Sequence, residues 1–229
     1  MDESQKPVPF ADGLDHVCAA CRDAIGRIDA VGLTLITGTH ARISLAATGR
    51  MAQLGERWEF SLGEGPGLQA FRNRLPVLVP DLTDPEQIAD WPVFAGEAAE
   101  WGLRAVFAYP VLLGPSPVAV LTLYRGGTGA LSPAGHRLAE LHAGLAATLL
   151  GQAGRDLTVI GDCDEVAMLT PQVSVVHQAV GMVMERHGLS ADQAMAHLRA
   201  MAYTCRRPVD ELAADVVQRR ISYSIEDMP

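Results

Sequence analysis

Lysine is almost absent from this chain of 229 residues: Lys6 is the only one, and every other basic side chain is an arginine. Basic residues are also outnumbered, since 18 lysines and arginines stand against 27 aspartates and glutamates and the formal net charge is −9. A strongly basic surface is the usual mark of a nucleic-acid-binding protein. The composition therefore argues against tight nucleic-acid binding by a single copy of the chain.

Cysteine is scarce as well, with Cys18, Cys21, Cys163 and Cys205 the only four. This spacing excludes the disulfide framework of a small secreted domain. A Cys-x-x-Cys pair such as Cys18 and Cys21 can be a redox pair or half of a zinc site. However, no second cysteine or histidine pair with ligand spacing accompanies it. We expect both thiols to be small apolar residues of a helix stripe, and we predict neither a metal nor a cofactor.

No apolar stretch has the length and continuity of a membrane span. Residues 105–124 carry no charge, but Pro110, Gly114, Pro115 and Pro117 interrupt them, which favours a buried β-hairpin. Residues 1–15 are polar and lack the apolar core of a signal peptide, so we expect a cytoplasmic protein with no membrane association.

The pattern present over the first 150 residues alternates between helix and strand. We expect helices over 14–25, 68–72 and 90–101, strands over 31–36, 42–48, 58–62 and 77–80, and a hairpin of 105–113 with 118–124. A last helix should begin after Ser132 and bury a stripe of Leu138, Leu141, Leu145 and Leu149. This order predicts an α+β fold with an antiparallel sheet.

A glycine-rich bend, Leu62-Gly63-Glu64-Gly65-Pro66-Gly67, precedes the short helix over 68–72. It is not a P-loop, because no Lys-Ser/Thr follows it. It can place backbone N–H groups around an anion at a helix N-terminus. Ordinary turn chemistry is the commoner cause of such residues, and both interpretations stay open.

The last sixty residues predict three short helices. Thr170 and Pro171 suit the start of the first, and Gly188 suits its left-handed end. Ser190 and Gln193 form a capping box for the second, with Ala194, Met195, Leu198, Met201 and Ala202 on its buried face. Pro208 starts the third, whose core side is Val209, Leu212, Ala213, Val216 and Val217. A coiled-coil-like stripe of Val173, Val176, Val180 and Val183 predicts a dimer seam.

Two features of this region point beyond packing. Arg199, Tyr203 and Arg206 follow one another at helical spacing and can form a stacking platform for unpaired bases, or simply a solvated face with a partly buried tyrosine. Gly181 stands in mid-helix, where glycine costs about 1 kcal/mol against alanine. It permits either tight helix packing or the close approach of another molecule.

The region from Val173 to Val217 resembles an ANTAR domain, the RNA-binding antiterminator module of bacterial regulators. The resemblance rests on Ala179-x-Gly181, on Arg186-His187-Gly188-Leu189-Ser190, on Ala194-x-x-x-Leu198-Arg199-x-x-Ala202, and on Leu212-Ala213-x-x-Val216. It implies binding of RNA hairpins by a homodimer. With the arginine–tyrosine line, it predicts RNA contacts at Ala179, Gly181, Arg186, Arg199, Ala202, Tyr203, Arg206 and Arg207. Val180 and Cys205 depart from the lysine and asparagine that such domains often carry.

The region from Leu14 to Leu150 resembles a GAF domain, a small-molecule and signal-sensing module of PAS-like architecture. The motif Phe60-x-Leu62-Gly63-Glu64-Gly65-Pro66-Gly67 carries this resemblance together with the element order. We therefore predict a GAF-like sensor over 12–150, a glycine-interrupted linker over 151–169 with a helical piece over 165–169, and an ANTAR domain over 170–223. The resemblance implies a small-molecule ligand whose identity the residues do not give.

These expectations converge on a signal-responsive regulator that binds a hairpin in nascent RNA and blocks a terminator. The near-neutral tail, with six basic and seven acidic residues over 171–229, also fits a dimerising protein-interaction module without nucleic acid. A three-helix unit that docks in a DNA groove is a further alternative. We do not expect an enzyme, since no nucleophile, base and orienting group share a recognisable spacing.

Overall fold

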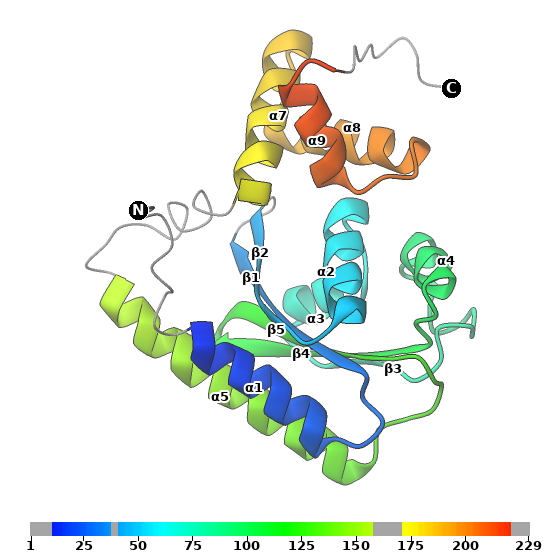
Figure 1. Cartoon of the computed structure of the whole chain (residues 1–229), viewed down its shortest axis with the longest axis vertical. Helices are drawn as coiled ribbons and strands as arrows, with labels where there is room; N and C mark the ends of the chain where they lie inside the picture. Colours follow the sequence, from blue (N-terminus) through cyan, green and yellow to red (C-terminus); the bar gives the residue numbers. More distant parts are fainter. Residues whose placement is uncertain (1–10, 38–40, 158–170, 221–229) are drawn as a thin grey trace, which may run out of the picture. The chain divides into compact units, whose positions relative to one another are not determined.

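The computed structural model describes residues 11–37, 41–157 and 171–220 (Figure 1). Two compact units share the chain: the first holds residues 1–36, 44–59 and 64–161, and the second holds residues 37–43, 60–63 and 162–229. In chain order the first 157 residues form α1 (Ala11–Ala24), β1 (Ala30–Thr37), β2 (Ala41–Ala47), α2 (Arg50–Leu62), α3 (Pro66–Asn73), β3 (Val77–Val79), α4 (Pro92–Glu100), β4 (Ala105–Leu113), β5 (Ser116–Arg125) and α5 (Pro133–Leu157).

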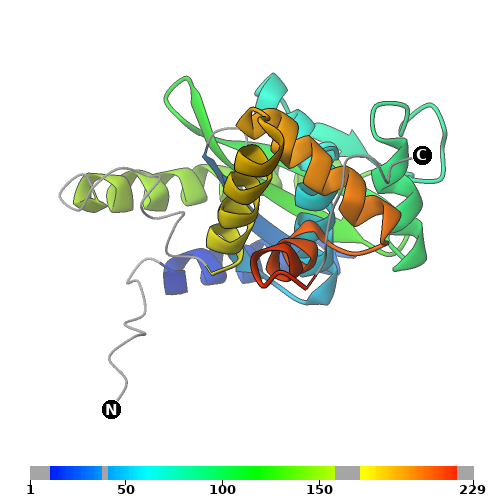
Figure 2. The same ribbon diagram turned by 90° about the horizontal axis from the view of Figure 1, so that it is seen from above.

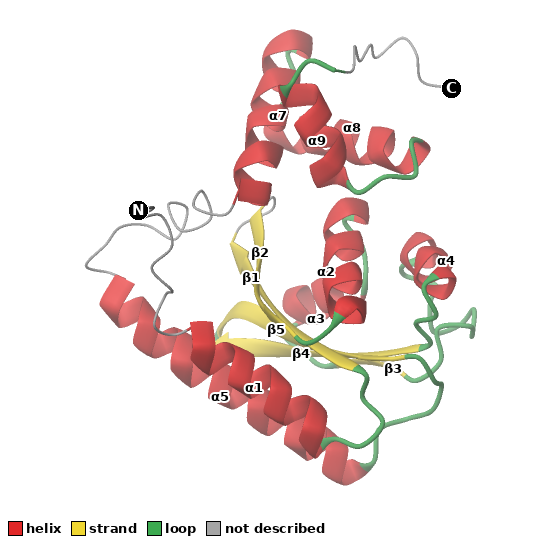
Figure 3. Ribbon diagram, viewed as in Figure 1, coloured by secondary structure: helices red, strands yellow, loops and turns green. Residues whose placement is uncertain are grey.

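The five strands form one sheet in the order β2-β1-β5-β4-β3, coloured yellow in Figure 3. Strand β5 pairs antiparallel with β1 on one side and with β4 on the other, and β3 closes the edge beside β4. The charge-free stretch is the β4–β5 hairpin, as predicted, with a register shift between Val111 and Leu112. No helix among the described residues is long and apolar enough to cross a membrane. The predicted α+β fold with an antiparallel sheet is confirmed.

Helices α1 and α5 lie side by side on one face of the sheet, and α2 and α3 lie on the other (Figure 1). Cys18 and Cys21 are fully buried in α1, in the cluster that joins α1, α5 and the sheet. Burial raises the pKa of each thiol to about 12, so both stay protonated at neutral pH. The thiols therefore behave as the apolar stripe residues that the sequence predicted.

The face of α5 that packs on α1 and the sheet differs from the predicted one. Leu141 and Leu145 are exposed, and the buried positions are Ala139, Ala143 and Ala146. Small side chains allow the helix to approach the sheet closely, and leucine at these positions would hold it away. The predicted leucine stripe was therefore wrong for Leu141 and Leu145, whereas Leu138 and Leu149 do pack against the buried cluster. Ser132 caps the helix, as predicted, by accepting a hydrogen bond from the Gly135 N–H at 3.0 Å.

Two further expectations in this region were wrong. Residues 58–62 are the end of helix α2 and not a strand; Ala52, Gly55 and Glu59 of this helix are buried at helical spacing. Helix α5 continues through Gly151 and Gly154 to Leu157, so these glycines do not interrupt it. The turn over 38–40, the helical piece over 165–169, Cys163, Thr170 and the predicted end of the domain at 223 lie outside the described residues.

The second unit contains α7 (Pro171–His187), α8 (Ala191–Thr204) and α9 (Val209–Val217). Helices α7 and α8 run in different directions, as the view from above shows (Figure 2). Gly188 takes the left-handed conformation that ends α7, with a φ of 65°. Both hydrogen bonds of the capping box between Ser190 and Gln193 are present, and Pro208 precedes α9. The three predicted helices are confirmed with nearly the predicted ends.

Candidate nucleic-acid interface

The valine stripe of α7 faces the core of its own unit. Val176, Val180 and Val183 are buried there, against Leu198 of α8 and Leu212 of α9. The side chain of Val173 lies outside the described part of the helix. Because a side chain that is buried within one chain cannot also meet a second copy, the predicted seam is corrected to a core stripe. Ala179 and Ala202 are buried in the same cluster and offer no surface for contact.

Gly181 lies on the opposite, exposed side of α7. A Cβ atom at this position would meet no described atom within 4 Å, apart from the backbone of its own helix. Tight packing against the described part of the chain, the commoner reason for a helical glycine, therefore does not explain this residue. Gly181 leaves an open strip of backbone that another molecule can approach. Arg186 is exposed one turn further along α7.

Tyr203, near the end of α8, is 51% exposed. Helix α8 ends at Thr204, and Arg206 follows it with a positive φ of 50°. Arg206 therefore lies beyond the helix and does not continue the predicted line of Arg199 and Tyr203 at helical spacing. Its side chain is exposed and has no partner among the described residues. The exposed aromatic ring and the neighbouring guanidinium are the parts of the predicted platform that face solvent.

Arg199, the first member of the predicted line, is half-buried. Its Nε–H donates a hydrogen bond to the Phe60 carbonyl at 3.2 Å, and its guanidinium lies 5.9 Å from the centre of the Phe60 ring. Both partners belong to the second compact unit. The structure therefore engages Arg199 within its own unit and does not place it with Tyr203 on open surface.

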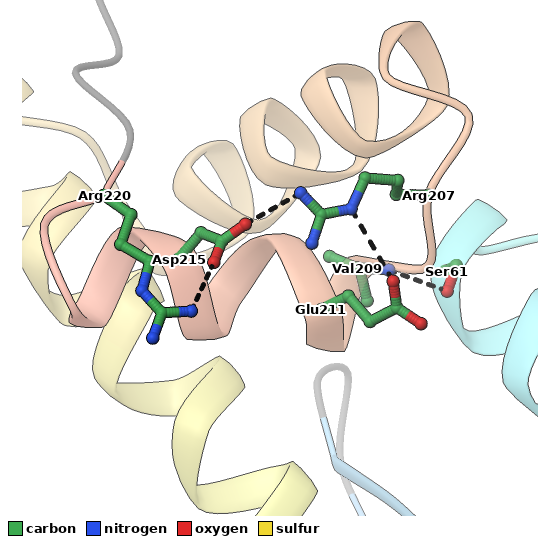
Figure 4. Close-up of polar contacts among 6 residues, drawn as sticks. All are labelled: Ser61, Arg207, Val209, Glu211, Asp215 and Arg220. Carbon is green, nitrogen blue, oxygen red and sulfur yellow. Dashed lines mark hydrogen bonds and ion pairs between the residues drawn. The ribbon is translucent and has the colours of Figure 1, made fainter.

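Arg207 also differs from the prediction. Its Nη1 donates to the Asp215 carboxylate at 2.7 Å, and its Nε lies 3.6 Å from the Glu211 carboxylate, as Figure 4 shows. Arg220 adds a weaker contact to Asp215 at 3.5 Å. The hydrogen bond from Arg207 lowers the pKa of Asp215. We assign Arg207 to bracing the α8–α9 turn against α9, a role that the sequence analysis missed because its partners lie four and eight residues further on.

One backbone N–H of the glycine-rich stretch in the first unit binds a carboxyl group, that of the chain's own Glu59. The Gly67 N–H at the start of α3 donates to Glu59 Oε1 at 2.9 Å. Glu64 within the bend holds the start of α4 in the same way, by accepting from the Val93 and Phe94 N–H groups at 2.9 Å each. Carboxylates are favourable at helix N-termini, where the backbone donors are otherwise unpaired. The motif therefore forms a turn, and of the N–H groups predicted to face an anion, that of Gly67 binds a carboxyl group.

Glu56, one turn before Glu59, packs against the sheet at Gly32 and accepts a hydrogen bond from Ser44. The pKa of Glu56 is raised to about 7, mainly by burial and in smaller part by the nearby Glu59 carboxylate. A separate hollow of about 320 Å³ lies between β4 and α5 and is lined by Arg74, Tyr109 and Glu140 among others. No group of three or more metal-ligating side chains occurs in the described ranges.

Comparison with known proteins matches residues 9–150 to the GAF domain family and residues 172–217 to the ANTAR domain family. No curated protein matches the chain significantly. Among solved structures, the GAF domain of an Acinetobacter phosphoenolpyruvate-protein phosphotransferase is 15% identical with a TM-score of 0.51, over 70% of this chain and 91% of that one. The GAF domain of the Coxiella burnetii phosphoenolpyruvate-protein phosphotransferase is 14% identical with a TM-score of 0.51, over 64% and 85%. The GAF domain/HD domain protein from Geobacter sulfurreducens is 12% identical with a TM-score of 0.50, over 62% and 92%. At these identities the similarity concerns the fold alone.

Proposed function

This chain belongs to the GAF domain family and carries an ANTAR domain after it, and from this premise we propose that it is a signal-responsive RNA-binding antitermination regulator. The GAF domain receives a small-molecule signal, and the ANTAR domain binds a hairpin in nascent RNA. Among solvent-facing side chains of the three helices, Tyr203 with the neighbouring Arg206 gives the proposal its main support. An exposed ring beside a guanidinium can stack on an unpaired base and neutralise a phosphate.

The charge of the chain bears on how many copies act together. Residues 171–229 carry six basic and seven acidic side chains, and one of the arginines, Arg207, is occupied by Asp215. Because phosphate neutralisation supplies much of the affinity for nucleic acids, one such domain offers little of it. We propose that the protein acts as a homodimer, in which two weak contacts combine through their effective concentration. The valine stripe is not the seam of this dimer.

The double variant Arg199→Ala with Arg206→Ala tests the RNA-binding face. We expect its affinity for hairpin RNA to fall at least fivefold, because the contact of the exposed Arg206 is lost together with the contact that Arg199 makes once it leaves Phe60. The far-UV circular dichroism should stay unchanged. Affinity is measured by gel shift at several salt concentrations, and wild-type binding should weaken as salt rises because counterions are released.

The matched control is Arg72→Ala with Arg137→Ala, which removes the same charge from exposed positions of the first unit. If this control and the Arg199→Ala, Arg206→Ala variant bind hairpin RNA with equal affinity, the RNA-binding site does not include Arg199 and Arg206. Absence of wild-type binding to any hairpin RNA at low salt would instead favour the protein-interaction alternative.

Gly181→Ala separates packing from contact on α7. In the free protein we expect the melting temperature of the helical unit to rise, because alanine is favoured by about 1 kcal/mol in a helix interior and the new methyl group meets no neighbour. We expect RNA affinity to fall, because the methyl group blocks the open backbone strip. Thermal melting and a gel shift of the same sample give the two readouts. An unchanged affinity in a more stable variant would show that RNA does not approach Gly181.

A further inference from the structure

The last three residues of α2, Phe60–Leu62, and the following Gly63 belong to the second compact unit, although the rest of α2 belongs to the first. We call them the anchor segment. Ser61 is 2% exposed, and its Oγ accepts a hydrogen bond from the Val209 N–H at 3.0 Å (Figure 4). Val209 is the first residue of α9, whose N-cap Pro208 provides no side-chain cap. The anchor segment therefore supplies a cap that α9 lacks in its own sequence.

The same segment holds Arg199. The Phe60 carbonyl accepts from Arg199 Nε–H, and the Phe60 ring lies under the guanidinium. Phe60 also packs on the buried cluster of the three helices. Gly63 completes the fit, because a Cβ atom at this position would lie 2.9 Å from Arg199 Nη1. One arginine of the proposed RNA face is thus held by the carbonyl and the ring of Phe60 and lies close to the backbone of Gly63.

We propose that the anchor segment is an autoinhibitory element, which withholds Arg199 from RNA until α2 moves. The inference rests on the proposed function, because it assumes that Arg199 contacts RNA when released. The Arg199 side chain is half-buried, with its Nε–H and one face of the guanidinium turned to Phe60 and its Nη1 close to Gly63, so this geometry leaves little of the group open to a phosphate or base. Binding of RNA through Arg199 therefore competes with the anchor contacts.

The position of Glu59 suggests how a signal reaches the anchor. Glu59 directly precedes Phe60 on α2 and holds the start of α3 through the Gly67 N–H. In the first unit its carboxylate fills the space that side chains at Gly65 and Gly67 would need. We infer that a displacement of the start of α3 moves Glu59 through their hydrogen bond. Phe60 is the next residue along α2, so the same displacement reaches Phe60. Glu59 and Phe60 are consecutive residues of α2, and this covalent link is the route that we infer for the signal.

The test is RNA affinity of the full-length chain carrying Phe60→Ala, or Phe60→Leu. Leucine keeps the apolar packing and removes only the aromatic face. The Phe60→Leu variant is therefore used to measure RNA affinity if the Phe60→Ala variant has a lower melting temperature than the wild type. We expect affinity for hairpin RNA to rise at least fivefold, the lower range of measured allosteric couplings. We expect no rise when the same change is made in an Arg199→Ala background.

A second readout needs no RNA. Phenylglyoxal modifies accessible guanidinium groups, and peptide mass spectrometry reports the modified residues. Loss of the Phe60 ring should increase modification of Arg199 several-fold and leave the exposed Arg206 unchanged as an internal reference. Unchanged or lower RNA affinity of a folded Phe60 variant, with normal wild-type binding, overturns the autoinhibition and leaves the proposed function intact. A different result is that neither the wild type nor the variant binds hairpin RNA, while phenylglyoxal modifies Arg199 more in the variant than in the wild type. That result overturns the proposed function itself, and the autoinhibition with it.

Discussion

Gly65→Ala should destabilise the GAF domain by about 2–6 kcal/mol, the largest effect that we expect of a single methyl group in this chain. Gly65 has a φ of 142° and a ψ of 167°, a backbone region that is essentially restricted to glycine and costs other residues on the order of 1–3 kcal/mol. The added Cβ would also lie 2.5 Å from Glu59 Cγ, and overpacking of this kind typically costs about 1–3 kcal/mol. The two effects act together because the strained backbone cannot turn away from Glu59.

Urea unfolding followed by circular dichroism measures this loss. Gly96→Ala is the matched control, since Gly96 lies on the exposed side of α4 and a Cβ there would meet no described atom within 4 Å. That variant should be as stable as the wild type or slightly more stable, because alanine is favoured over glycine in a helix. If the two variants unfold at the same urea concentration, the cradle around Glu59 is not the reason for the glycine.

Gly65 also illustrates what the sequence could and could not reveal. The bend and the anion-binding geometry were predictable, because they depend on residue types that stand next to one another. The anion was not, because Glu59 lies eight residues before its partner Gly67 and its carboxylate reaches the start of α3 only once α2 is a helix. Residues 58–62 were predicted as a strand, so no carboxylate was available to the prediction.

A similar limit applies to the helical unit. Helix ends were predictable, since the capping box at Ser190 and the left-handed Gly188 act within a few residues. The role of the α7 valines was not, because a stripe at this spacing fits a dimer seam and a three-helix core equally well. Only the positions of Leu198 and Leu212 decide between them. The partners of Arg199 are still less accessible to prediction, since Phe60 lies 139 residues earlier in the chain.

Tyr203→Ala should weaken hairpin RNA binding more than any other single substitution on the exposed face of α8. Stacking of a base on an aromatic side chain contributes about 1–3 kcal/mol by alanine substitution, which corresponds to roughly a 5- to 150-fold change in affinity. The stability of the helical unit should change little, because the ring is 51% exposed and lies outside the buried cluster. Isothermal titration calorimetry or a gel shift at fixed salt measures the loss.

Tyr203→Phe keeps the ring and removes only the hydroxyl, so stacking predicts affinity within about twofold of the wild type. A hydroxyl that donates to the RNA predicts instead that phenylalanine and alanine lose affinity alike. The salt dependence adds a third criterion, because loss of stacking lowers affinity without changing the number of released counterions, whereas loss of an arginine contact lowers the slope. A Tyr203→Ala variant that binds as well as the wild type at every salt concentration would remove the aromatic platform from the proposed interface. Arg206 and the open backbone at Gly181 would then be its remaining solvent-facing parts among the residues argued here.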